Sequence, residues 1–141
     1  MTLEDLDRTL QNGLHDAQIG ALTHDYERAI VRLDVRIVVG SPEEDITNRL
    51  RYRSGEILFH QVLFCAIECP ENGRILGHPG SIWFVFDRIE PGAFKEEIAK
   101  ALPPAALCYS LYILEWESQI RIAAGDVSFS WSDSDGAPAV D

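Results

Sequence analysis

The sequence lacks any long apolar run and any export signal. No stretch approaches the ~20 consecutive apolar residues that a membrane-spanning helix requires. The first residues, MTLEDLDRTLQN, are acidic and amphipathic, whereas a secretory signal peptide has a basic start and an apolar centre. We therefore expect a cytoplasmic protein that does not bind membranes.

Cysteine is also scarce. The three cysteines, Cys65, Cys69 and Cys108, are an odd number in a chain without an export signal, which argues against a disulfide framework. Cys65 and Cys69 lie in or at the end of an apparent strand, where four residues span roughly 13 Å, while zinc ligands converge within about 4 Å of one another. We expect structural thiols, and we predict neither a bound metal nor a cofactor.

The sequence also has few positively charged residues. It contains 12 lysines and arginines against 23 aspartates and glutamates, which gives a net charge of −11. Such an acidic chain disfavours general binding to nucleic acid and suits a basic protein partner. The sequence does not decide whether the chain forms homo-oligomers. The sequence also lacks a Gly-rich phosphate loop and the serine motif of a strand–elbow–helix nucleophile, so we assign no catalytic residue.

Local signals predict two helices. The chain of 141 residues fits one domain. Residues 2–13 predict a short helix, because Thr2 can cap its start with Asp5 in capping-box position and Gly13 can stop it. Residues 90–104, EPGAFKEEIAKALPP, predict a second helix that two prolines end.

Strand patterns dominate the rest of the chain. Residues 29–39, AIVRLDVRIVV, alternate apolar and polar side chains, which is typical of a strand with one buried and one wet face. Residues 56–69 are apolar on both faces and predict one central strand covered on both sides. Residues 81–89 predict a second buried strand, and residues 106–131 predict a late hairpin around Glu117. The core residues expected from these strands are Phe59, Leu63, Trp83, Val85 and Leu111.

This order of elements does not alternate strand and helix, so it predicts an α+β fold. We expect a single domain over residues 1–131, with a mainly antiparallel, twisted sheet of about 6–8 strands and two helices covering one of its faces. Residues 132–141, SDSDGAPAVD, predict an acidic, flexible tail.

Residues 14–25, LHDAQIGALTHD, contain two His-Asp pairs in a predicted strand. On a straight strand His15 and His24 point to opposite faces, because their separation is odd. Asp16 and His24 share a face but lie roughly 26 Å apart. The two pairs therefore cannot form one metal site, and His24 and Asp25 are expected at a turn.

His15 is expected on the apolar face of this strand, beside Ala17 and Ile19. Two interpretations stay open. His15 and Asp16 form either a structural site, with a partly buried histidine that ties the helix end to the sheet, or a catalytic or ligand-binding site. The second interpretation requires an orienting partner and a cleft.

The segment that begins LHDA and continues into the alternating strand resembles the opening of a loose set of small bacterial proteins of unknown function. Their distinctive letters are those of His15, Asp16 and Ala17. EILFHQVLFCAIE, residues 56–68, is similar to the apolar strand of those proteins, and IRIAAGDVSF, residues 120–129, is similar to their closing strand. Some of them are grouped with immunity proteins of polymorphic toxin systems. The resemblance implies an immunity-like role and supplies no catalytic residue.

Residues 28–53 are basic, with six arginines against four acids. If residues 29–39 and 46–53 pair as a hairpin with Val39 opposite Ile46, five arginines share one exposed face. Like charges directly opposite each other are unfavourable, so two interpretations stay open. Either a neighbouring acid of the protein compensates the arginines, or the face binds an external anion or an acidic partner. Arginine is suited to the second role because its guanidinium binds carboxylate and phosphate groups in a bidentate way. These arginines are Arg32, Arg36, Arg49, Arg51 and Arg53.

Trp116 and Trp131 lie near the ends of predicted strands, where aromatic side chains can anchor an interface. The leading hypothesis is a non-enzymatic cytoplasmic protein-binding module, most concretely an immunity-like inhibitor of a basic toxin. The alternative is a small-molecule-binding or enzymatic domain with a pocket between sheet and helices near His15. An open face with acidic and aromatic side chains favours the first, and a pocket with convergent polar side chains favours the second.

Overall fold

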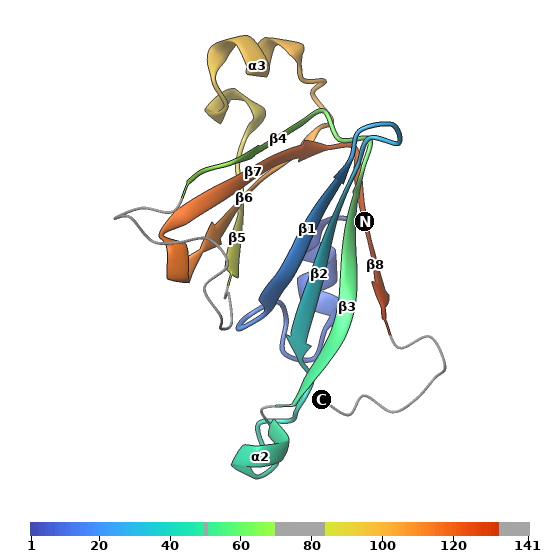
Figure 1. The fold of residues 1–141 in the computed structure, drawn as a ribbon, viewed down its shortest axis with the longest axis vertical. Coiled ribbons are helices and arrows are strands. Elements are labelled where there is room, and N and C mark those ends of the chain that lie inside the picture. The colour runs from blue at the N-terminus through green and yellow to red at the C-terminus, as the bar shows by residue number, and fades with distance from the viewer. Residues whose placement is uncertain (50, 70–83, 133–141) are drawn as a thin grey trace.

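The computed structural model describes residues 1–49, 51–69 and 84–132. These residues form eight strands in two antiparallel sheets, together with short helices, so the predicted α+β class is confirmed (Figure 1). The strands are β1 (Gln18–Asp25), β2 (Ile30–Val38), β3 (Tyr52–His60), β4 (Phe64–Ile67), β5 (Phe84–Arg88), β6 (Leu107–Ile113), β7 (Ser118–Ala124) and β8 (Asp126–Trp131). The helices are α1 (Leu3–Thr9), α2 (Ile46–Arg49) and α3 (Glu96–Ala101), with the 3-10 turns η2 (Pro91–Ala93) and η3 (Leu114–Trp116).

The strands form two sheets rather than one. Sheet A has the order β1-β2-β3-β8, and sheet B has the order β4-β7-β6-β5. β2 shows the predicted alternation, with its apolar side chains buried and its polar side chains outward. The inward side chains of both sheets and those of α1 pack into one main core. Each sheet therefore has an inner, apolar face and an outer face.

α1 begins as predicted. The hydroxyl of Thr2 accepts a hydrogen bond from the backbone N–H of Asp5 (3.1 Å), and the carboxylate of Asp5 accepts one from the N–H of Thr2 (3.0 Å), which completes a capping box. The helix ends at Thr9, before the predicted stop. Gly13 lies in the following turn with a φ of 63°, a backbone conformation that favours glycine.

Residues 56–69 do not form the single central strand that the sequence predicted. The backbone turns at Gln61, which has a φ of 52°, and the segment divides into β3 in sheet A and β4 in sheet B. Its apolar residues serve two cores: Phe59 belongs to the main core, while Phe64 packs edge-to-face on Phe94 in a second, smaller one. This division explains why both faces of the segment are apolar.

β7 and β8 also form one run of chain that bends, in this case at Gly125. A Cβ at Gly125 would collide with the side chain of Gln61, so the two bends fit closely against each other. The backbone N–H of Gly125 donates to the carbonyl of His60 (2.9 Å). The chain thus passes between the two sheets twice at the same corner, once from β3 to β4 and once from β7 to β8 (Figure 1).

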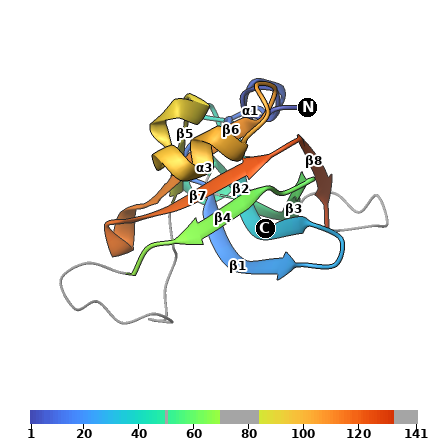
Figure 2. The same cartoon turned by 90° about the horizontal axis from the view of Figure 1, so that it is seen from above.

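The predicted second helix is confirmed in a shorter form as η2 and α3. It covers part of the outer face of sheet B (Figure 2), where Phe94 is buried and Ile98 and Leu102 are partly buried. The expectation that both helices cover one face is wrong, because α1 packs into the main core instead. Among the described helices, none is long and apolar enough to cross a membrane.

The predicted core is correct in part. Phe59 and Leu111 are fully buried, but Leu63 is 51% exposed and Val85 is 52% exposed. Leu63 lies in the corner between β3 and β4, and Val85 lies on the outer side of β5, an edge strand. Trp83 and residues 133–141 of the predicted tail lie outside the described residues. The hairpin of β6 and β7 turns at Glu117, which has a φ of 49°, as predicted.

Candidate functional site

His15 is exposed. Residues 14–17 form a turn before β1, so the prediction that His15 lies on the apolar face of a strand is wrong, although Ala17 and Ile19 are buried as expected. The His15 side chain is 84% exposed, and its Nε2 lies 3.6 Å from Oδ2 of Asp16. The pair therefore does not tie the helix end to the sheet, and it is not enclosed in a cleft.

The second His-Asp pair shapes the turn between β1 and β2. Oδ1 of Asp25 accepts a hydrogen bond from the backbone N–H of Arg28 (3.1 Å), and the His24 ring stacks on Tyr26 with ring centroids 4.1 Å apart. These contacts agree with the turn position expected for both residues.

No group of three or more histidine, cysteine, aspartate or glutamate side chains in the described part of the chain is arranged to hold a metal ion. All three cysteines are free thiols. Cys108 is buried, Cys65 is half-buried and Cys69 is exposed. Burial raises the pKa of the Cys65 and Cys108 thiols, so these two are poor nucleophiles at neutral pH.

The five arginines do not share one face. Residues Ile46–Arg49 form α2 instead of a strand, because the carboxylate of Asp45 accepts a hydrogen bond from the backbone N–H of Asn48 (2.9 Å) and begins a helical turn. β3 begins later, at Tyr52, and its register pairs Arg53 with Ile37 on the inner side of sheet A. The predicted pairing of Val39 with Ile46 is wrong for the same reason.

Acids of the same segment compensate two of these arginines. Nε of Arg32 lies 3.3 Å from Oδ1 of Asp34, and Nη2 of Arg51 lies 3.4 Å from Oε1 of Glu44. The sequence left open whether acids of the protein or an external anion compensate the arginines. For Arg32 and Arg51, acids of the protein compensate the positive charge.

Aromatic rings hold two further arginines. The guanidinium of Arg36 lies 5.2 Å from the centroid of the Tyr52 ring, and that of Arg53 lies 4.2 Å from the centroid of the Trp131 ring. Arg53 thus covers Trp131. The Trp131 ring also packs edge-to-face on the Phe129 ring, with ring centroids 4.8 Å apart. Both Trp131 and Trp116 are partly buried against the main core, so neither projects as a free anchor. Arg49 lies in α2 and is exposed.

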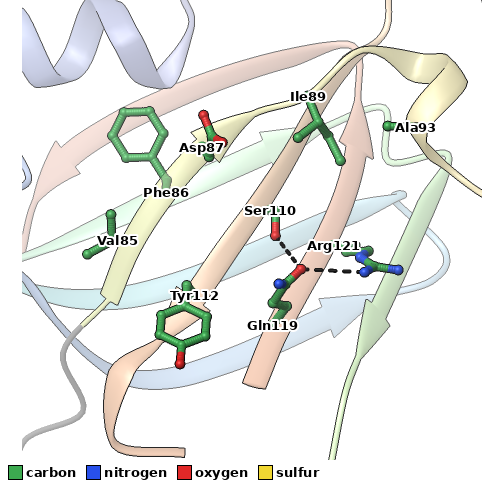
Figure 3. A pocket seen from close by; sticks show the side chains of 9 residues that line it. All are labelled: Val85, Phe86, Asp87, Ile89, Ala93, Ser110, Tyr112, Gln119 and Arg121. Carbon is green, nitrogen blue, oxygen red and sulfur yellow. Dashed lines mark hydrogen bonds between the residues drawn. The ribbon is translucent and has the colours of Figure 1, made fainter. Parts of the chain in front are cut away.

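A hollow that the sequence did not predict lies on the outer face of sheet B. Alternation along β6 and β7 turns Ser110, Tyr112, Gln119 and Arg121 outward while their neighbours enter the main core. The hollow has a volume of about 450 Å³. Its lining residues are Val85, Phe86, Asp87, Ile89, Ala93, Ser110, Tyr112, Gln119 and Arg121 (Figure 3).

Strand register sets two rows of side chains across this hollow. Asp87, Ser110 and Arg121 lie directly opposite one another on β5, β6 and β7 and form the first row. Val85, Tyr112 and Gln119 form the second row. Because neighbouring strands are about 4.8 Å apart, Asp87 and Arg121 stand on backbone positions separated by roughly 10 Å.

Hydrogen bonds fix the centre of the hollow (Figure 3). Oε1 of Gln119 accepts one from the Ser110 hydroxyl (2.8 Å) and one from Nη2 of Arg121 (3.5 Å). The same guanidinium nitrogen lies 3.4 Å from Oε1 of Glu68, which offsets the arginine's charge. With its oxygen occupied, the Gln119 amide presents its N–H donors to the hollow.

Asp87 and Tyr112 are the polar groups of the hollow that this network leaves out. The Asp87 side chain has neither an ion pair nor a hydrogen bond with any other described residue, and the same holds for the Tyr112 hydroxyl.

Two further hollows continue the first. One of about 400 Å³ lies between β4 and α3 and shares Arg121; Phe64, Phe94 and Ile98 make it largely apolar. Another, of about 250 Å³, lies over the edge of β5 and shares Val85 with the first; its other lining residues include Asp7 and His15. We call this series of three hollows the sheet B tract.

The hydrogen bonds of the tract do not pair the Ser110 hydroxyl with a base among the described residues. The Ser110 hydroxyl donates to an amide oxygen, which is not a general base able to activate a nucleophile. Asp87 and Glu68 flank opposite sides of sheet B, three strand spacings or about 14 Å apart, which is beyond the separation of the carboxylate pairs used in glycoside hydrolysis.

No protein-family model matches the chain, and comparison with curated proteins and with solved structures found no significant match. The family resemblance carried by His15, Asp16 and Ala17 therefore stays a prediction.

Proposed function

We propose that this chain is a non-enzymatic, cytoplasmic protein-binding module that binds a basic protein through the sheet B tract. The observation that carries the proposal is the continuity of the tract, which runs from Phe94 beneath α3 through Arg121 to Val85 at the edge of β5. A small-molecule site is concave and encloses most of its ligand. A long series of shallow hollows instead suits the contoured surface of a protein partner.

Charge supports a basic partner. The chain has a net charge of −11, and the tract holds three acids, Asp7, Glu68 and Asp87, against two cations, Lys95 and Arg121. Complementary charge steers encounter and disfavours wrong partners.

The most concrete form of this function is an immunity-like inhibitor of a basic toxin. An inhibitor needs a binding surface and no chemistry of its own, which agrees with a tract in which the described residues pair no nucleophile with a base. His15, from the motif that resembles immunity proteins, lines the third hollow of the tract.

The test is capture of a partner by the full chain, compared with two variants that each place a charge at an exposed apolar position. Val85 is 52% exposed and lies in the tract, whereas Ile46 is 64% exposed and lies on α2, at the end of the molecule opposite α3 (Figure 1). We expect the wild-type chain and I46R to retain a basic protein in a stoichiometric complex and V85R to lose it. A partner retained equally by V85R, or an acidic partner, would overturn the proposal.

A further inference from the structure

We infer that Ser128 is a reactive hydroxyl, activated by His60, that accepts an acyl group from an activated ester. The site lies on the outer face of sheet A, outside the sheet B tract, so its test does not depend on the proposed function. The reaction is a covalent modification of the chain itself, in which one acyl group is transferred and remains on Ser128.

The first argument is the contact between a hydroxyl nucleophile and a base. Nε2 of His60 lies 2.6 Å from Oγ of Ser128, which is within hydrogen-bonding distance. When Nε2 carries no proton, it accepts a hydrogen bond from the hydroxyl, and this is the arrangement in which a histidine activates a serine. The Ser110 hydroxyl, by contrast, donates to the amide oxygen of Gln119, which cannot take up its proton.

The second argument is the strand register that places the pair. β3 and β8 lie side by side in sheet A (Figure 1). Ser128 stands opposite Leu58, two positions from His60 on β3, so His60 and Ser128 are diagonal neighbours on one face of the sheet. The backbone N–H of Gly125 donates to the carbonyl of His60 (2.9 Å) and fixes the chain at this end of the two strands. Both side chains are half-buried, so the hydroxyl is held by its surroundings and still meets solvent.

The third argument is the negative charge beside the base. Asp126 stands directly opposite His60 on β8. Its Oδ1 accepts a hydrogen bond from the amino group of Met1 (2.6 Å), which holds the carboxylate at this position and offsets part of its charge. A carboxylate next to an imidazole stabilises the imidazolium that forms when the ring takes up a proton. Asp126 therefore favours proton transfer from Ser128 to His60.

A hollow of about 260 Å³ beside the pair gives the acyl donor room. It lies over β1, β2 and β3, and its lining includes Leu58, the cross-strand neighbour of Ser128. Leu58 and Ile30 supply apolar surface for the acyl or aryl group of a small ester.

The transfer needs no group beyond this pair and the donor. As Oγ of Ser128 attacks the carbonyl carbon of the ester, its proton passes to Nε2 of His60. The bond from that carbon to the leaving oxygen then breaks, and the leaving group departs with the electron pair and takes the proton from His60. The products are an ester on Ser128 and a free alcohol or phenol, and the imidazole is again neutral.

The experiment treats the full chain with p-nitrophenyl acetate, a small activated ester, at neutral pH. Tandem mass spectrometry locates the acetyl groups and separates Ser128 from the lysines and the amino terminus, which such esters also acetylate. Ser128 should be acetylated on the order of a hundredfold faster than Ser130, the effect expected of a positioned general base. H60Q should abolish this difference, because a glutamine side chain can bond to the hydroxyl but cannot take up its proton. D126N should slow the reaction several-fold and move its pH dependence to lower pH, because the imidazolium loses a neighbouring negative charge.

Ser130 is the matched control within the same chain. It lies two positions further along β8, is exposed, and donates its hydroxyl hydrogen to Oε1 of Glu56 (3.4 Å) instead of to a histidine. S130A should leave the acetylation of Ser128 unchanged, and S128A should remove the fast reaction. Equal acetylation of Ser128 and Ser130 in the wild-type chain, or an unchanged rate at Ser128 in H60Q, would overturn the inference. The first comparison needs no variant, so it decides the matter even where H60Q is less stable than the wild type.

Discussion

The hydroxyl of Tyr109 donates a hydrogen bond to Oε2 of Glu4 at 2.7 Å and joins the first helix to the centre of sheet B. The same hydroxyl accepts a hydrogen bond from the backbone N–H of Leu3 (3.1 Å). The Tyr109 ring is fully buried, edge-to-face with Phe59 and Phe86. Burial and the bond to Glu4 raise the pKa of Tyr109 far above its ordinary value of 10.0, so the phenol stays protonated and remains a donor.

Y109F should lower the free energy of unfolding by about 1–3 kcal/mol, because it leaves a buried backbone N–H without its acceptor. Y112F is the control, since the Tyr112 hydroxyl has no hydrogen bond with a described residue, and it should change stability little. Urea unfolding of both variants measures the difference. Equal stability of Y109F and the wild type would show that the hydrogen bonds of Tyr109 do not hold α1 in place.

Glu4 should contribute to the loss of stability in acid. Burial acts to raise its pKa, but the hydrogen bond from Tyr109, further hydrogen bonds and the charge of Arg88 together bring it below the ordinary value of 4.5. The unfolded chain then binds this proton more readily than the folded chain does. The stabilisation is therefore complete above about pH 4.5 and is lost as the pH falls through the lower value of the folded state.

E4Q removes this titration. The stability of E4Q should be lower than that of the wild type at neutral pH, and the gap should narrow as the solution is acidified below pH 4.5. Unfolding curves collected across the acid range test this. A gap of constant size would mean that the ionisation of Glu4 is not linked to folding.

Leu111 and Leu63 give a matched comparison of burial. Leu111 is fully buried in the main core and Leu63 is 51% exposed at the corner between the sheets. L111A should cost about 2–5 kcal/mol of unfolding free energy, as large-to-small changes in a core do, while L63A should cost under about 1 kcal/mol. Denaturation midpoints that rank the two variants in the opposite order would contradict the division of residues 56–69 at the corner.

The arginines of residues 28–53 should not form an anion site. Four of them already have partners within the protein: two form ion pairs with Asp34 and Glu44, and two lie over aromatic rings. Low-millimolar phosphate should therefore leave the melting temperature unchanged, because a ligand stabilises a protein only by binding its folded state. R51A should cost only ~0–1 kcal/mol at this partly exposed pair. A rise in melting temperature with phosphate that R51A removes would contradict this assignment.

Local signals predicted two elements whose cause is local. The capping box of Thr2 and Asp5 and the alternation of β2 depend on residues close together in the chain, and both are confirmed. The split of residues 56–69 was not predictable from its apolar pattern, because a turn at Gln61 that fits against Gly125 depends on two distant segments meeting.

The candidate site was missed for the same reason. The serine, tyrosine, glutamine and arginine that face outward from β6 and β7 stand at alternate positions of a hairpin that the sequence did predict, so this part of the pattern was available. Asp87 comes from β5, and its place beside Ser110 follows from strand order in sheet B, which no local pattern specifies. The prediction of a shared arginine face was wrong for a different, local reason. The capping contact in which the Asp45 carboxylate accepts the backbone N–H of Asn48 was overlooked, so residues of α2 were expected in a strand and the register of β3 was misplaced.

The most direct test of the central claim is amide hydrogen exchange of the chain alone and in complex with the basic partner that it captures. If the sheet B tract is the binding surface, the complex should slow exchange in residues 84–89 and 93–98, beside the hollows, and leave residues 20–25 of edge strand β1 in sheet A unchanged. Protection confined to β1 or to α2, with unaltered exchange along β5 and α3, would contradict it.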